Sequence, residues 1–65
     1  KDLAALEARI DKLEQILAAL ADQMDLARGD AALVTALGVE YAQREQELEM
    51  LLEEWAEAAG GEKPA

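Results

Sequence analysis

The chain has 65 residues, enough for one small domain, and its formal net charge of −9 opposes attachment to phosphate backbones or anionic lipid. It contains no cysteine and no histidine, so disulfide bonds and ordinary zinc sites are excluded. Because the sequence has no signal peptide and no long apolar run, we expect a soluble, cytoplasmic protein with no membrane partner.

Apolar residues in the first part of the chain recur with the period of a coiled coil. They alternate steps of three and four residues over more than three heptads, which predicts a first helix over about residues 3–27 with one apolar seam. Such a seam indicates packing against another helix. Its members are Leu3, Leu6, Ile10, Leu13, Leu17, Leu20 and Met24.

The segment that follows, about residues 28–31, has the composition of a turn between two helices. Gly29 can end a helix in the left-handed conformation, and Asp30 can cap the helix that comes next. We therefore expect the chain to reverse its direction at this point.

A second seam with the same spacing predicts a second helix over about residues 31–59. Gly60 and Gly61 are good helix terminators, so residues 60–65 are predicted to form a flexible C-terminal tail. The seam of this helix consists of Val34, Leu37, Tyr41, Arg44, Leu48, Leu51 and Trp55.

The two seams fit one antiparallel register. Residue numbers in each layer of an antiparallel pair must sum to a constant. The seams, continued by Ala27 and Ala58, give 61 in every layer, as for Leu17 and Arg44. The turn that this register implies lies next to Gly29. Spacing and loop chemistry therefore agree on an all-α fold, an antiparallel two-helix coiled-coil hairpin over residues 1–59.

Arg44 is the one charged residue in the seam. It is expected to face Leu17, with Glu40 one turn back and with Glu14 and Glu45 flanking it. A long arginine stem can cover apolar surface while its guanidinium reaches carboxylates at the edge. A polar residue in one layer also fixes the register at some cost in stability. The alternative interpretation is an arginine that binds a partner.

The acidic second helix offers no recognisable catalytic or metal site. Glu45, Glu49 and Glu53 fall near one another, and paired carboxylates can ligate a metal or transfer protons. Both roles need desolvation or further converging ligands, and the sequence shows neither these nor a phosphate loop or a nucleophile–base pair. We expect no enzyme activity, no catalytic, cofactor-binding or metal-binding residue, and no small-molecule substrate.

Two features could mark contacts with other molecules. Arg28, at the expected hairpin tip, is the best-placed basic residue for a nucleic-acid or partner contact, although Asp25 and Asp30 stand beside it. Several apolar residues lie off the seam, where a two-helix hairpin has no third layer to cover them, and we expect a parent protein or a second copy to do so. The alternative is scattered surface apolar residues that need no explanation. These off-seam residues are Ile16, Leu26, Leu33, Val39, Met50 and Leu52.

Two motifs carry a family resemblance that covers roughly residues 3–58. The first helix reads "LEARIDKLEQILAALAD", with Leu20-Ala21-Asp22 leading into the loop, and the second closes on "LEMLLEEWAE", with Leu51-Leu52-Glu53-Glu54-Trp55 at its centre. This order of motifs resembles the C-terminal coiled-coil domain of ABC-F family ATPases, in particular the Uup branch.

The resemblance implies a soluble parent protein with two ATPase domains that bind ATP and act on ribosomes. In the Uup branch it implies that the hairpin contributes to DNA binding. No part of the ATPase machinery lies in these residues, so the resemblance implies a non-catalytic accessory domain without a cofactor of its own. Hairpins of this family that bind nucleic acid tend to be basic, and the charge of −9 favours contact with protein, such as the parent's ATPase domains, over ribosome or nucleic acid. The alternatives are DNA or RNA binding through the tip and a self-standing oligomerisation coiled coil.

Overall fold

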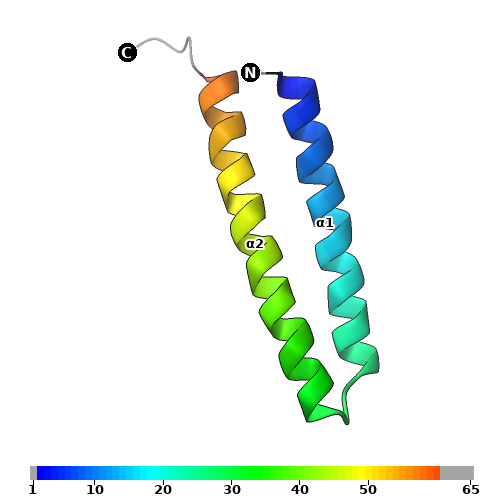
Figure 1. The fold of residues 1–65 in the computed structure, drawn as a ribbon. Coiled ribbons are helices and arrows are strands. Elements are labelled where there is room, and N and C mark those ends of the chain that lie inside the picture. The colour runs from blue at the N-terminus through cyan, green and yellow to red at the C-terminus, as the bar shows by residue number, and fades with distance from the viewer. Residues whose placement is uncertain (1, 61–65) are drawn as a thin grey trace.

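The computed structural model describes residues 2–60, which form two α-helices joined by a short loop. α1 comprises Leu3–Leu26 and α2 comprises Ala31–Ala59. The helices lie side by side and antiparallel, so the start of α1 and the end of α2 lie at the same end of a rod 52 Å long (Figure 1). The predicted all-α helical hairpin is thereby confirmed. Of the predicted tail, residues 61–65 lie outside the described part of the chain.

An aspartate caps the start of each helix. The side chain of Asp2 accepts hydrogen bonds from the backbone N–H groups of Ala4 (3.0 Å) and Ala5 (3.4 Å). The side chain of Asp30 accepts one from the backbone N–H of Leu33 at 3.1 Å, as predicted from the loop sequence. These bonds satisfy N–H groups that the first turn of a helix leaves without a helical partner.

The loop differs from its prediction, because no residue in the described part of the chain, Gly29 included, has a positive φ. α1 ends at Leu26, and the N–H of Ala27 still bonds to the carbonyl of Gln23 (2.9 Å). The carbonyl of Ala27 then accepts from the N–H groups of Gly29 (3.0 Å) and Asp30 (2.9 Å). The chain thus turns through ordinary backbone conformations, and the freedom of a glycine is not needed there.

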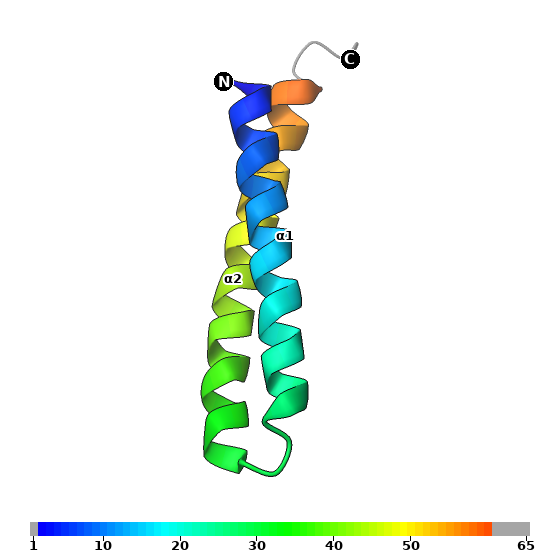
Figure 2. The same ribbon diagram turned by 90° about the vertical axis from the view of Figure 1, so that its right-hand side faces the viewer.

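The core of the hairpin follows one side of α1. Four leucines of α1 are buried, with exposures of 4–8%, whereas no residue of α2 is fully buried. The large side chains of Tyr41 and Trp55 are half-buried, so α2 covers the leucines with groups that keep one edge in solvent. Seen from the side, the helices cross, as expected for helices that share a heptad seam (Figure 2). The buried leucines are Leu6, Leu13, Leu17 and Leu20.

The rest of the predicted seam lies at the helix–helix contact in a half-buried state. This group comprises Leu3, Ile10, Met24, Val34, Leu37, Arg44, Leu48 and Leu51. Of the apolar residues off the seam, Ile16 is half-buried and the other five are exposed, with Leu26 the most exposed at 87%. The hairpin therefore leaves apolar side chains uncovered beside its core.

Candidate functional site

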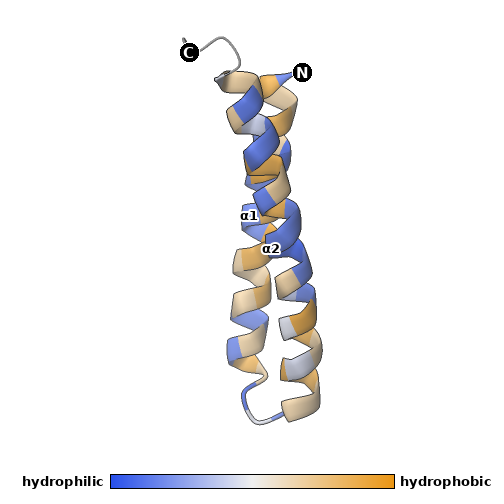
Figure 3. Cartoon of the chain, turned by 90° about the vertical axis from the view of Figure 1, so that its left-hand side faces the viewer, coloured by the Kyte–Doolittle hydropathy of each residue, from blue (hydrophilic) through white to orange (hydrophobic). Residues whose placement is uncertain are grey.

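Charge is distributed unevenly along α2. Residues 31–39 carry no charged side chain, whereas residues 40–57 carry seven glutamates and a single arginine. Figure 3 shows the change along α2, from mainly hydrophobic colours beside the loop to mainly hydrophilic ones further on. The charge that α2 can present to a partner therefore lies in its part away from the loop.

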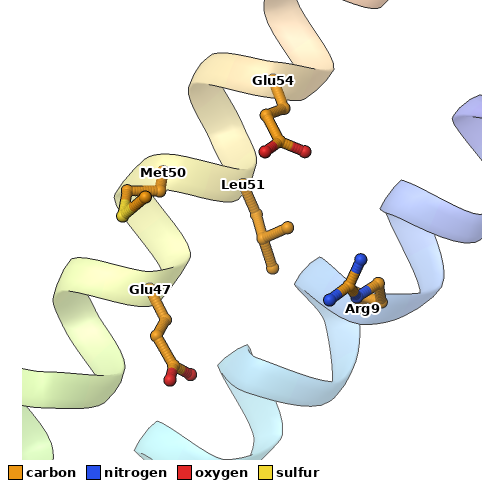
Figure 4. A pocket seen from close by; sticks show the side chains of 5 residues that line it. All are labelled: Arg9, Glu47, Met50, Leu51 and Glu54. Carbon is orange, nitrogen blue, oxygen red and sulfur yellow. The ribbon is translucent and has the colours of Figure 1, made fainter. Parts of the chain in front are cut away.

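Two shallow grooves run along that region, one on each edge of the helix pair. The first, which we call the acidic groove, is lined by Glu7, Ile10, Asp11, Glu14, Leu52 and Trp55. The second, which we call the mixed-charge groove, is lined by Arg9, Lys12, Leu13, Ile16, Arg44, Glu47 and Leu51. It continues past Arg9, which faces α2 between Glu47 and Glu54, to the exposed Met50 (Figure 4). The three basic residues within the two helices all line this second groove, so the two edges differ in charge.

The acidic groove has an apolar floor and an acidic rim. Ile10 and Trp55 are half-buried, and Leu52 is 43% exposed. The indole Nε1 of Trp55 donates a hydrogen bond to Oε2 of Glu7 across 3.0 Å, which connects α2 to α1 at the rim. On the same rim, the carboxylate of Asp11 accepts a hydrogen bond from Nε2 of Gln15 at 3.0 Å. The arrangement suits a ligand that is apolar on one side and positively charged at its edges.

Arg44 lies in the mixed-charge groove, and its partner differs from the carboxylates expected. Its Nη1 is 3.2 Å from Oε1 of Glu47, one turn further along α2, with 30% of the Arg44 side chain exposed. The prediction of Glu14, Glu40 and Glu45 as its partners is wrong. Arg44 lines the same groove as Lys12, whereas Glu14 lines the opposite groove. Its Nε is buried and has no hydrogen-bond partner within residues 2–60.

Arg28 lies in the loop at the tip of the hairpin, where the sequence places it. Its side chain is 83% exposed, and its Nε is 3.5 Å from Oδ1 of Asp25. A neighbouring carboxylate therefore balances the positive charge at the tip. This pairing weakens the attraction of the tip for phosphate.

Neither a metal centre nor a membrane span is found among residues 2–60. No three or more Asp or Glu side chains there are arranged so that they could hold a metal ion together. No helix in that part of the chain combines the length and apolarity that crossing a membrane demands. What the described surface offers is contact through apolar side chains and charge.

The sequence did not reveal the acidic groove as a site. The antiparallel register places Trp55 opposite Leu6. The residue after Leu6 could have indicated the hydrogen bond of Trp55. Glu7 follows Leu6 at the edge of the same layer, within reach of an indole N–H that needs an acceptor when its ring is packed. In the heptad pattern, Leu52 is only an apolar residue off the seam.

Comparison with known proteins gives one family. A family model described as "ABC transporter C-terminal domain" matches residues 1–59, which include both helices and the loop. Searches of curated proteins and of solved structures found no match to the chain.

Proposed function

The chain belongs to the ABC transporter C-terminal domain family, and we propose that it is the non-catalytic coiled-coil accessory domain of a soluble, cytoplasmic ABC-F-type ATP-binding protein. The observation that carries this proposal is the family match, which extends over the whole helical hairpin. Two sequence motifs support the finer assignment to the ABC-F type. Leu20-Ala21-Asp22 lies in the last two turns of α1, and Trp55 lies in the last two turns of α2, in the order that the Uup-like hairpins show.

The domain acts through contacts with protein, either the ATPase domains of its parent or a ribosome-associated protein. The net charge of −9 and the carboxylates on the rim of the acidic groove support this choice. ATP is bound by the parent's other domains, and the hairpin itself has no cofactor, no metal and no substrate.

Binding of DNA or RNA through the tip is disfavoured by the same charge and by the pairing of Arg28 with Asp25. Fluorescence anisotropy with labelled duplex DNA and RNA at low salt tests it directly. We expect no saturable binding. Binding that weakens steeply with salt and is lost in Arg28→Glu would make the tip a nucleic-acid site and contradict the proposal.

The accessory role is tested in the full-length protein that contains this hairpin. Removal of residues 2–60 should leave basal ATP hydrolysis in place, because no nucleotide-binding group is removed. Crosslinking mass spectrometry, with Lys12 as one attachment point, should show the hairpin joined to protein surfaces of the parent or of the ribosome. Loss of ATP hydrolysis to the level of a nucleotide-site mutant, or crosslinks to nucleic acid alone, would contradict the proposal.

A further inference from the structure

The acidic groove combines a partly exposed apolar floor with a rim of one sign of charge. Leu52, 43% exposed, lies beside the half-buried Ile10 and Trp55, and Glu7, Asp11 and Glu14 complete the lining. Among residues 2–60, no basic side chain contributes to its lining. On α2, Glu45 and Glu49 precede Leu52 by seven and three residues and so extend the acidic edge toward the loop.

From this arrangement we propose that the acidic groove binds a basic amphipathic helix of a partner protein, which packs on this edge as a third helix. The inference rests on the proposed role of the hairpin as a protein-contact domain, and it names the surface and the chemistry of the partner. The partner presents apolar side chains to Ile10, Leu52 and Trp55, and lysines or arginines to the rim.

A helix fits the shape of the groove better than a small molecule does. The groove lies between two long helices, and an amphipathic helix can place apolar side chains at positions i, i+3, i+4 and i+7 into such a furrow. Its volume of about 230 Å³ is below the range of roughly 300–1,000 Å³ typical of small-molecule sites. A space of this size can hold the end of one side chain of the partner helix, while the rest of that helix packs along the groove.

Charge selects a basic partner and disfavours a second copy of the chain. Desolvated carboxylates without opposite charges would oppose docking of an apolar or acidic helix, whereas lysine or arginine side chains meet them favourably. Two copies that met at this edge would place like-charged rims together, and each copy carries a net charge of −9. The occupant is therefore a basic helix of a partner protein.

Trp55 provides a direct reporter for the test, because it is the chain's single tryptophan and its indole N–H forms part of the rim. The probe is a synthetic amphipathic peptide about five helical turns long, with leucine on one face and lysine on the other. Titration into the ¹⁵N-labelled chain, followed through the indole N–H resonance, should give a saturable shift that weakens with added salt. A peptide of the same composition, with the leucines scattered around the helix, should bind at least about tenfold more weakly because it presents no apolar face.

Matched variants locate the contact. Leu52→Ala should weaken peptide binding about tenfold, a difference of about 1.4 kcal/mol. Met50→Ala, which shortens a side chain that is 65% exposed beside the opposite groove, should leave it unchanged. Glu14→Gln on the rim should weaken binding more than Glu57→Gln, which changes the net charge equally away from the groove. Circular dichroism verifies that each variant retains its helices.

Several results would overturn the inference. These are the absence of a saturable shift, equal binding of the scattered peptide, equal effects of the two alanine variants, and an indole shift on concentrating the chain without peptide. Any of the first three results would mean that the peptide does not bind or is held only by general attraction between opposite charges. The indole shift without peptide would mean that a second copy of the chain occupies the groove. None of them bears on the deletion experiment above. The deletion and the Leu52→Ala variant of the full-length protein can also be compared. If the crosslinks between hairpin and protein partner are lost on deletion but persist in Leu52→Ala, the accessory role stands and this groove is not the contact.

Discussion

Trp55 and Glu7 join the two helices by a hydrogen bond at the end of the hairpin opposite the loop. Nε1 of the indole lies 3.0 Å from Oε2 of the carboxylate, although the residues are 48 positions apart in the sequence. The loop holds the helices together at one end, and this bond connects them near the other. It therefore acts where helix ends fray most readily.

The energetic coupling between these two residues can be measured by a double-mutant cycle. Glu7→Ala and Trp55→Phe each remove the hydrogen bond and should each lower the free energy of unfolding. The pair should show a coupling of about 0.5–1.5 kcal/mol, because the bond lies at an exposed edge. Urea denaturation followed by circular dichroism gives all four values. Glu14→Ala combined with Trp55→Phe is the control, and the effects of its two substitutions on the free energy of unfolding should be additive. Additivity in the Glu7 cycle would show that the bond contributes nothing in solution.

Two leucines of α1 should differ sharply in their response to the same substitution. Leu17 is buried in the core and Leu26 is 87% exposed beside the loop. Leu17→Ala removes buried methyl groups and should cost about 2–5 kcal/mol, which is comparable to the whole stability of so small a domain. Leu26→Ala should change the stability by less than about 0.5 kcal/mol. Thermal melts of the two variants provide the comparison, and similar losses would place the core elsewhere.

The conformation of the loop leads to a prediction for Gly29. Its φ is not positive, and a Cβ built at this position has no atom within 4 Å. Gly29→Ala should therefore leave the stability unchanged or raise it by up to about 1 kcal/mol, because alanine restricts the unfolded chain more than glycine does. A loss of roughly 1–2 kcal/mol in a thermal or urea melt would indicate a left-handed residue and contradict the loop described above.

Arg44 should limit stability and help to define the register of the helices. Its Nε is buried without a partner within residues 2–60, and its ion pair with Glu47 lies at a partly exposed edge. Arg44→Met keeps the apolar stem and removes the charge, so the free energy of unfolding should rise by about 1 kcal/mol. Arg28→Met at the exposed tip is the control and should have no effect.

The same variant tests specificity. A seam with methionine at position 44 has no polar layer, and polar layers in coiled coils discriminate against other registers and oligomers. Sedimentation equilibrium over a hundredfold range of concentration should show more self-association for Arg44→Met than for the native chain. An unchanged mass together with lower stability would mean that Arg44 contributes mainly through favourable contacts.

The sequence was sufficient for the helical hairpin because periodicity and loop chemistry encode it directly. The 3–4 spacing defines one face of each helix, and Asp30 marks the start of the second helix through a bond formed within its own first turn. These are local properties, and they do not depend on how side chains settle at the interface.

Other features depend on choices that the pattern leaves open. Arg44 could leave the seam at either edge, and it pairs with Glu47 on its own helix, whereas the expected carboxylates included Glu14 across the interface. The turn could close with or without a left-handed glycine, and the carbonyl of Ala27 accepts two N–H groups in a way that needs none. The contrast between the two grooves emerges only when side chains from both helices are placed in space.

The burial of the core leucines on α1 alone gives the two helices different freedom to change during evolution. Substitutions along the inner face of α1 create cavities, so that helix is constrained to keep its leucines. The contact residues of α2 are half-buried, and its outer glutamates are exposed to solvent. Substitutions on α2 can therefore change its surface while the hairpin stays folded. A saturation library should accordingly show a conserved inner face on α1, whereas the exposed residues of both helices, including Glu7, Asp11 and Glu14 on the groove rim, can vary and give new binding specificities.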